Sequence, residues 1–236
     1  MTVKENFKKL GGLITDLVFP ISCLVCGKEG SYLCANCQAK LPRLEKQQCL
    51  VCQKPSPFGK THPECVTRNS VDGIISSLTY KNPTVQEIIR VFKYNFVSSL
   101  SQPLSEMIIE AMQTQGLADY FRDFVIVPVP LHPRRHNWRG FNQALLLSQA
   151  LSQTLEIPID EELIKRVKFT KPQVQLKAKE RKTNIEKAFS LQANAANKKI
   201  ILVDDVVTSG ATLNEIAKLL KQSKVSEVWG LTAAQG

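Results

Sequence analysis

The stretch that most constrains the fold lies near the C-terminus and spans residues 200–213. Its sequence is Ile-Ile-Leu-Val-Asp-Asp-Val-Val-Thr-Ser-Gly-Ala-Thr-Leu. Apolar residues lead into two adjacent carboxylates, Asp204 and Asp205. After two more apolar residues comes a turn of small and hydroxyl-bearing residues. Beyond the turn, apolar residues recur at helical spacing. This order predicts a buried strand, a sharp loop and the N-terminus of a helix.

The predicted loop is suited to bind a phosphate group. Small residues let the backbone approach a ligand closely. Hydroxyl and N–H groups at a helix start donate hydrogen bonds to an anion, and the helix dipole also favours its charge. Two carboxylates at the strand end suit the hydroxyls of a sugar or a bound Mg²⁺. The run therefore predicts a sugar-phosphate site, the alternative being an ordinary strand end.

The run resembles the 5-phosphoribosyl-1-diphosphate (PRPP) binding signature of type I phosphoribosyltransferases. The resemblance implies that Asp204 and Asp205 meet the ribose hydroxyls as catalytic residues, that Mg²⁺ binds with PRPP, and that the loop wraps the 5′-phosphate. Similar enzymes that salvage 6-oxopurines have an acid where Thr208 stands, which argues against that reaction here. The residues implied to bind PRPP are Asp204, Asp205, Val206, Val207, Thr208, Ser209, Gly210, Ala211 and Thr212.

All seven cysteines fall within the first 65 residues. Six form three Cys-x2-Cys pairs, and the seventh follows a histidine at the same spacing. Two intervening residues let both side chains of a pair reach one tetrahedral ion, so four pairs predict two zinc sites. The spacing leaves open whether the pairs combine sequentially or interleave. The candidate ligands are Cys23, Cys26, Cys34, Cys37, Cys49, Cys52, His62 and Cys65.

Disulfide bonds are the alternative use of these cysteines. They require an oxidising compartment, and no export signal is evident. The odd number of cysteines, with a histidine filling the gap, also favours metal. Four protein ligands leave no position for water. The zinc is therefore expected to be structural and to stabilise a segment too short to fold on its own apolar core.

The chain has 236 residues, 43% of them hydrophobic, which is enough for one large domain or a small and a medium one. No apolar run is long enough to span a membrane. Residues 8–20 faintly resemble a signal peptide, but Asp16 interrupts them and no small-residue cleavage site follows. We expect a short helix there that packs on the protein.

Apolar periodicity predicts strands that alternate with helices, which is typical of a parallel sheet with helices on both faces. Ligands bind at the carboxyl ends of the strands in such sheets. We expect an N-terminal helix and double zinc module over residues 1–68 and a phosphoribosyltransferase-like α/β domain over 69–236. The predicted strands are 71–80, 124–129, 162–167, 188–191, 200–204 and 227–232, and the predicted helices are 84–94, 101–116, 141–155 and 211–222.

Two basic segments are expected to meet at the signature. Residues 127–143 follow a predicted strand, and their arginines suit a pyrophosphate group. Residues 170–189 form a polar segment suited to close over a reacting sugar and exclude water. The alternatives are a solvated basic turn and a disordered connector. The residues expected at the pyrophosphate are Pro128, Val129, Arg134, Arg135, Arg139 and Arg181.

Aromatic and histidine side chains of segment 127–143 are interpreted structurally. Trp138 and Phe141 are expected to pack in the protein, the alternative being stacking on single-stranded nucleic acid. His132 and His136 have no cysteine nearby and are weak metal candidates. The formal net charge is +10, and nine Lys or Arg between Leu163 and Lys187 supply most of the excess. Such a concentration suits a polyanion, either nucleic acid or pyrophosphate, the alternative being a solvated basic loop.

These motifs together resemble the ComF family, also called ComFC or GntX-like. The resemblance rests on Leu17-Val-Phe-Pro20, the cysteine pairs, Arg139-Gly-Phe-Asn-Gln143, the Gln-Leu-Glu-Arg-Asn-Ala-Phe positions of 173–189 and the signature loop, in this order. It implies a zinc finger joined to a type I phosphoribosyltransferase domain in a cytoplasmic protein of DNA uptake during natural transformation, or of DNA use as a nutrient.

Three functions fit the sequence. The first is a phosphoribosyltransferase or PRPP-binding protein of nucleotide metabolism. The second is a competence factor that binds single-stranded DNA and is regulated through the PRPP site. The third is a zinc-dependent scaffold for competence-machinery proteins such as a helicase. No general base is evident near the signature, so neither turnover nor the acceptor is assigned.

Overall fold

The computed structural model describes residues 21–95, 97–170 and 184–236. The chain divides into two compact units, Met1–Leu41 and Pro42–Gly236. The second cysteine and histidine group, Cys49 to Cys65, therefore belongs to the larger unit. The domain boundary at residue 68 stays a prediction. The helix predicted within residues 8–20 and the basic stretch 171–183 lie outside the described residues.

In the smaller unit, a tight turn and a short helix bring the cysteines of each pair together. The backbone turns sharply after Cys23, whose carbonyl accepts from Gly27 N at 2.9 Å. Gly27 has a φ of 73°, a conformation that glycine adopts without steric cost. Helix α2 (Ala35–Lys40) begins directly after Cys34 and buries Cys37. Each cysteine pair is thus fixed by local backbone hydrogen bonds.

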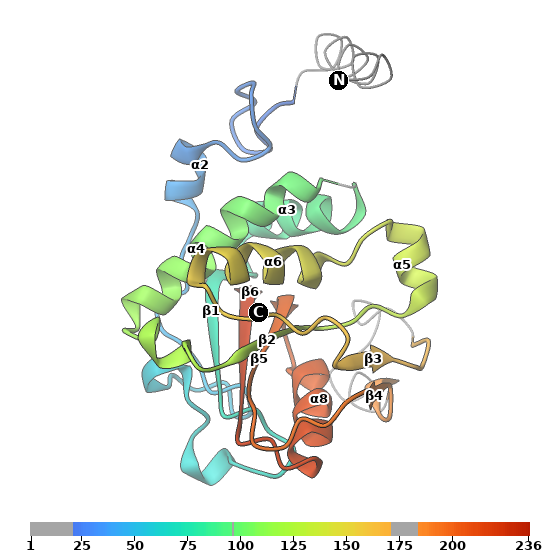
Figure 1. The fold of residues 1–236 in the computed structure, drawn as a ribbon. Coiled ribbons are helices and arrows are strands. Elements are labelled where there is room, and N and C mark those ends of the chain that lie inside the picture. The colour runs from blue at the N-terminus through green and yellow to red at the C-terminus, as the bar shows by residue number, and fades with distance from the viewer. Residues whose placement is uncertain (1–20, 96, 171–183) are drawn as a thin grey trace. The chain divides into compact units, whose positions relative to one another are not determined.

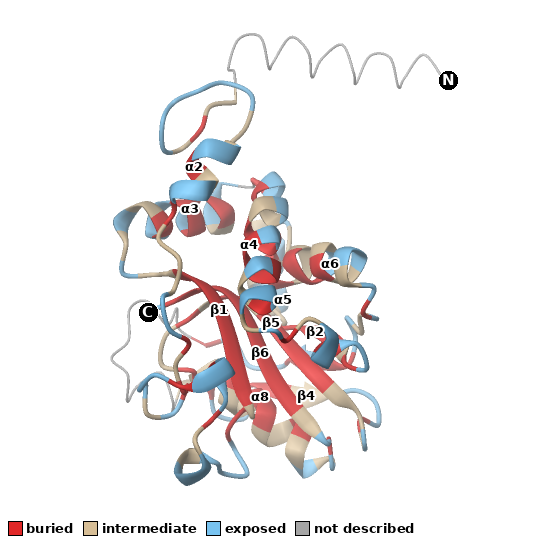
Figure 2. Ribbon diagram, turned by 90° about the vertical axis from the view of Figure 1, so that its left-hand side faces the viewer, coloured by how far each residue is buried: buried red, intermediate tan, exposed pale blue. Residues whose placement is uncertain are grey.

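The larger unit is built on four parallel strands in the order β1-β6-β5-β2 (Figure 1). They are β1 (Gly73–Thr79), β6 (Glu227–Gln235), β5 (Lys199–Val207) and β2 (Val125–Pro128). The strands are apolar and mostly buried (Figure 2), as expected for a parallel sheet covered on both faces. A bridge between Ile126 and Ile159 adds a short parallel segment outside β2.

Helices cover both faces of this sheet. The first pair is α3 (Pro83–Tyr94) and α4 (Ser101–Thr114), followed by α6 (Gln143–Leu155) and α8 (Ala211–Gln222). Helix α6 connects β2 to the bridge at Ile159, on the side of β2 away from β5, whereas α8 connects β5 to β6 in the opposite direction across the sheet. Because crossovers between parallel strands are right-handed, these two helices lie on opposite faces. Within the described residues, no helix combines the length and apolar character needed to cross a membrane.

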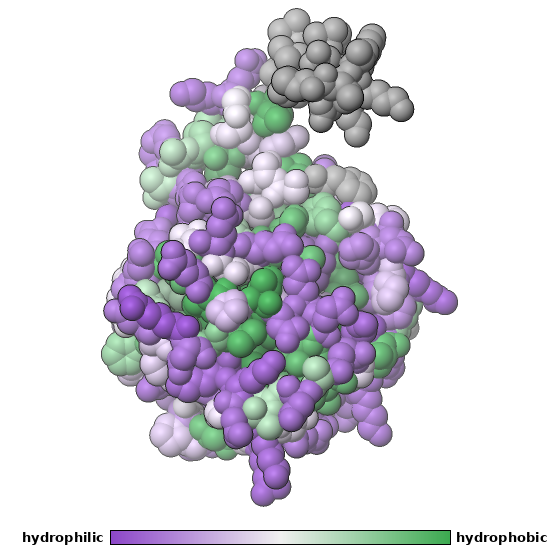
Figure 3. All heavy atoms as spheres, viewed as in Figure 1, coloured by the Kyte–Doolittle hydropathy of each residue, from purple (hydrophilic) through white to green (hydrophobic). Residues whose placement is uncertain are grey.

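Local signals explain the helix boundaries. Asn82 caps α3 by accepting from Thr84 N and Val85 N, and Pro83 occupies the first helical position. The apolar side of α3 follows the predicted spacing, with Val85, Ile88, Ile89 and Phe92 all buried. On the face shown in Figure 3, hydrophilic residues surround a small apolar area near the centre.

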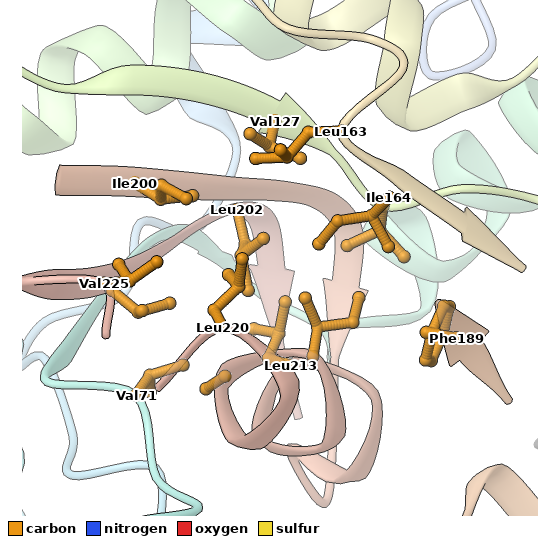
Figure 4. Packing of buried hydrophobic residues seen from close by; sticks show 14 of the residues in the cluster. Val71, Val127, Leu163, Ile164, Phe189, Ile200, Leu202, Leu213, Leu220 and Val225 are labelled. Atoms are coloured by element: carbon orange, nitrogen blue, oxygen red, sulfur yellow. The ribbon is translucent and has the colours of Figure 1, made fainter. Parts of the chain in front are cut away.

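The main core lies between β5, α8 and the paired strands β3 (Ile164–Arg166) and β4 (Phe189–Leu191) (Figure 4). Leu202 of β5 and Leu213 and Leu220 of α8 are almost fully buried there. A second packing centre consists of aromatic rings around Trp229, whose centroid is 5.3 Å from that of Phe121. Both centres rest on β5 and β6, so the middle strands are held from either side.

The structure departs from the predicted elements in three places. Helix α5 (Pro133–Arg139) occupies a stretch predicted as loop, and it has no buried residue that could produce an apolar pattern. Strands β3 (Ile164–Arg166) and β4 (Phe189–Leu191) pair antiparallel in their own small sheet. Strand β5 continues to Val207 rather than ending at Asp204, so both carboxylates belong to the strand. Short 3-10 turns are found at Pro57–Gly59, Pro63–Cys65, Ser98–Leu100 and Asp119–Phe121.

Candidate functional site

The two carboxylates of β5 differ in their surroundings. Asp205 is only 6% exposed, and its Oδ1 lies 2.9 Å from Nζ of Lys93 in the last turn of α3. Asp204 Oδ1 accepts the backbone N–H of Asp205 at 2.9 Å. A buried carboxylate is stable only when it is paired, and Lys93 supplies that pairing. Burial and the charge of Asp205 raise the pKa of Asp204 to about 7.

A cavity of about 450 Å³ opens beside these carboxylates. Its charged lining comes from four elements that are far apart in the sequence, α3, α5, β3 and β5. Five basic side chains face two acidic ones, an excess that favours a ligand with several negative charges. The charged lining residues are Lys93, Arg134, Arg135, Arg139, Arg166, Asp204 and Asp205.

Helix α5 positions three of the arginines. His132 caps it by accepting from Arg134 N through Nδ1, and Gly140 ends it with a φ of 73°. Asn142 then caps α6 and donates from Nδ2 to the carbonyl of Val129, which ties the turn to the end of β2. The Arg-Gly-Phe-Asn-Gln block thus acts as a corner between two helices.

Two arginines carry a buried side-chain nitrogen that has no acidic partner among the described residues. Arg166 of β3 is 8% exposed, and burial together with Arg135 lowers its pKa to about 10. Among the described residues, Nε of Arg166 and Nε of Arg139 have no hydrogen-bond acceptor. Leaving buried charged donors unpaired is costly. An anion in this cavity would satisfy them.

The signature loop offers a similar unsatisfied donor. Ser209 Oγ is buried and has no partner among the described residues. Gly210 has a φ of 68° and directly precedes α8, whose first-turn N–H groups have no partners within the helix. Of the residues implied to bind PRPP, Asp204, Asp205, Val206 and Thr212 line the cavity, whereas 208–211 do not. Val207 is 3% exposed and belongs to the main core.

The predictions for segment 127–143 can be compared with this geometry. Val129, Arg134, Arg135 and Arg139 line the 450 Å³ cavity. Pro128 instead lines a neighbouring cavity of about 690 Å³, as do His132 and His136. Arg181, in segment 170–189, lies outside the described residues. The first residue of that segment is beside the site, because Arg135 Nη2 donates to the Thr170 carbonyl at 2.6 Å.

Aromatic rings surround the cavity, which corrects one expectation. Trp138 was expected to pack in the protein, but it is 66% exposed because α5 has no buried side. Its ring contacts Tyr94 at a centroid distance of 5.9 Å, and the Arg139 guanidinium lies 4.7 Å from the Tyr94 centroid. Phe169 adds a third ring, 51% exposed. Phe141 does pack, against Phe92.

Sequence reasoning missed several site residues. Lys93 lies on a helix that the periodicity marked only as amphipathic, and Tyr94 follows it. Arg166 was counted in the basic segment without a role, and Phe169 was not considered. No local signal distinguished Arg166, because Lys165 precedes it and Lys168 follows two residues later.

The zinc ligands combine sequentially. The ligand atoms of Cys23, Cys26, Cys34 and Cys37 lie within 4.8 Å of one another, as do those of the group Cys49, Cys52, His62 and Cys65. The Cys26 and Cys34 sulfur atoms are 3.8 Å apart. Tetrahedral zinc with Zn–S distances of about 2.3 Å requires this separation. Burial and neighbouring thiols raise the pKa of Cys37 and of Cys65 to about 12, which a bound cation would reverse.

Comparisons with known proteins agree with both parts. Residues 14–66 match the double zinc ribbon domain, and residues 142–232 match the phosphoribosyl transferase domain. The chain is 36% identical to Competence protein F of Haemophilus influenzae, covering 85% of this chain and 84% of that protein. It is 34% identical to the DNA utilization protein YhgH of Escherichia coli (89% and 88%) and 28% identical to Competence protein ComFC of Bacillus subtilis (87% and 85%). The predicted fold class is confirmed.

We predict two zinc ions per chain. Replacing one ligand of the first group, Cys26→Ser, should leave one ion, because the second group shares no ligand with the first. Native mass spectrometry of the purified protein measures the stoichiometry. The exposed helix residue Asn36 provides a control, since Asn36→Ser should retain both ions. Loss of both ions from Cys26→Ser would contradict two independent sites.

The raised pKa of Asp204 predicts a pH-dependent stability. Between its ordinary value of 3.8 and about 7, the folded protein keeps a proton that the unfolded chain releases, so the free energy of unfolding falls as the pH rises. Asp204→Asn should therefore raise Tm by a few degrees at about pH 8 and change it little at about pH 4.

Thermal unfolding across this pH range measures the effect of Asp204→Asn. The matched control is Asp119→Asn, because the Asp119 side chain is 84% exposed. It should show no such crossover. An equal change in Tm at both pH values would show that the charge of Asp204 is not the cause.

Proposed function

Because the chain belongs to the family of Competence protein F, the DNA utilization protein YhgH and ComFC, we propose that it binds PRPP with Mg²⁺ and serves DNA uptake or utilisation in the cytoplasm. The phosphoribosyl transferase domain match supports the ligand class. The names of the relatives, which refer to competence and DNA utilisation, support the process. Thiol zinc ligands are compatible with a reducing compartment.

The observation that supports PRPP most is the pairing of two chemistries in one 450 Å³ cavity. Arg135, Arg139 and Arg166 form no ion pair with a carboxylate among the described residues, and Asp204 lines the same cavity. A ligand with a pyrophosphate at one end and ribose hydroxyls beside it would complement both. Its 5′-phosphate would then lie at 208–212, where Ser209 Oγ and the first N–H groups of α8 can donate.

In a transferase reaction, these residues would act mainly through charge. The bond from C1 of the ribose to pyrophosphate breaks, and its electron pair leaves with the pyrophosphate. The arginines stabilise that developing charge, and Asp204 faces the positive sugar. Mg²⁺ would supply further charge stabilisation, and Asp204 and Asp205 are donors of the type it prefers. We assign no acceptor, because no base is evident beside Thr208.

Isothermal titration calorimetry with PRPP and Mg²⁺ at about pH 8 tests the proposal. Asp204→Asn and Ser209→Ala should each weaken binding by about tenfold, because the first removes a charged oxygen that faces the sugar or its metal and the second removes a hydrogen bond to the phosphate. Asp123→Asn is the matched control, since Asp123 pairs with Lys199 at the surface outside the cavity. Wild-type protein that fails to bind PRPP would refute the proposal.

Single-stranded DNA is the second candidate ligand. The aromatic rim of the cavity, formed by Tyr94, Trp138 and Phe169, favours it. Trp138 and Phe169 are exposed rings, and Arg134 lies 5.4 Å from the Phe169 centroid. Exposed rings interleaved with arginines suit successive bases and phosphates. In this reading the PRPP site would regulate DNA binding, and a competence protein such as a helicase could receive the strand.

We predict that Trp138→Ala weakens binding of an oligothymidine by about tenfold, since stacking contributes 1–3 kcal/mol per base, roughly. Fluorescence anisotropy at several salt concentrations measures the affinity, which should fall as salt rises. Phe58 is an exposed ring on the ribbon, 50% exposed, and Phe58→Leu serves as the control. If Trp138→Ala and Phe58→Leu bound the oligothymidine equally well, the aromatic rim would not be part of a DNA-binding surface.

A further inference from the structure

The second zinc group lies in the same unit as the signature loop and contacts it through one side chain. That side chain is Leu50, between the ligands Cys49 and Cys52. Leu50 is 2% exposed and belongs to the main core together with Leu213 of α8. Its neighbour Val51 is 45% exposed. The two residues between the ligands therefore have opposite environments.

Leu50 packs directly against Gly210. A Cβ added at Gly210 would lie 2.6 Å from Leu50 Cγ and 2.8 Å from both of its methyl carbons. Contacts this short show that the leucine fills the space beside the glycine Cα. Gly210 also has a φ of 68°, and it sets the direction in which the N–H groups of α8 begin. The position of Leu50 thus limits where this turn can lie.

The segment that carries the second zinc group, residues 47–65, is called the second ribbon, and it is anchored to β1. The buried Gln47 donates from Nε2 to the Ser76 carbonyl and accepts from Ser76 N through Oε1, both at 2.9 Å. Thr61 Oγ1 donates to the Val71 carbonyl at 2.6 Å, and Asn214 of α8 accepts from Val71 N. The ribbon is therefore fixed to the sheet at its ends, and Leu50 projects from it against the loop.

Metal would fix the remaining freedom of Leu50. Cys49 and Cys52 flank the Leu50–Val51 dipeptide, and Cys52 Sγ lies 3.3 Å from Nδ1 of His62. The donor set of three sulfurs and one imidazole suits zinc. Ligation of both flanking cysteines to one ion restricts the backbone between them, so the leucine side chain is held in one direction.

We propose that the second zinc group positions the phosphate loop, with Leu50 as the positioning residue that transmits metal occupancy to residues 208–212. Loss of the metal frees Leu50, the turn at Gly210 relaxes, and the loop donors lose their alignment. The identity of the phosphate ligand rests on the proposed function, whereas the mechanical link between ribbon and loop does not.

Leu50→Ala and Val51→Ala in the full zinc-loaded chain form the matched pair. Ribose 5-phosphate serves as the probe in calorimetry, because it carries the 5′-phosphate without the pyrophosphate. Leu50→Ala should weaken its binding by about tenfold, since a small misplacement of positioned donors is costly. Val51→Ala should stay within about twofold of the wild type, and Leu50→Met, which conserves volume, should restore most of the affinity.

Amide hydrogen exchange reports the link without any ligand. In Leu50→Ala, the first hydrogen-bonded amides of α8 should exchange faster: that of Asn214, which donates to the Gly210 carbonyl at 2.9 Å, and those of 215–217. The amides of β2 should stay protected, which a general loss of stability would not produce. Cys52→Ser should act as Leu50→Ala does, and Cys26→Ser, in the first zinc group, should not.

The proposal would be overturned if the amides at the start of α8 exchanged at the wild-type rate in both Leu50→Ala and Cys52→Ser. So would unchanged binding of ribose 5-phosphate by Leu50→Ala when the wild type binds. If the wild type does not bind the probe, the proposed function loses its phosphate site, and the exchange experiment still decides whether Leu50 positions the loop.

Discussion

The parallel pairing of β2 with β5 is the constraint on which the rest of the site depends. Pro128 lies opposite Val203, and Val129 N donates to the Val203 carbonyl at 2.9 Å. Parallel strands end at the same edge of a sheet, so the chain leaving β2 must pass beside the carboxylates of β5. Helix α5 begins there with its arginines, and α6 returns the chain outward. One register therefore brings basic and acidic groups to one cavity.

Charge balance explains how so many ionisable groups share that cavity. Lys93 neutralises Asp205, which leaves Asp204 as the carboxylate whose protonation responds to pH near neutrality. The arginines of α5 and β3 form no ion pair among the described residues, although the charge of Asp204 acts on Arg166. This arrangement costs stability in the absence of an anion, and cavities that store such a cost are typical of binding sites. The second ribbon adds mechanical support through Leu50.

The elements that the sequence predicts well are those with local apolar patterns. The spacing in α3 and α8 and the buried run of β5 could be recognised without any tertiary information. Helix α5 could not, because it buries nothing and is held by His132 and Gly140 at its ends. Lys93 and Arg166 reach the site only through the packing of distant elements, which no local pattern records. The cysteine spacing predicted eight ligands and two sites, but which pairs share one site required coordinates.

The central claim is that the signature loop holds the 5′-phosphate while the arginines of α5 and β3 hold the pyrophosphate. Amide NMR of the isotope-labelled protein during titration with PRPP and Mg²⁺ tests it most directly. The account predicts large downfield shifts for the amides of 209–212, because N–H groups that donate to phosphate are deshielded, and shifts of the guanidinium signals of Arg139 and Arg166. Shifts confined to the arginines, with the amides of 209–212 unmoved, would contradict it.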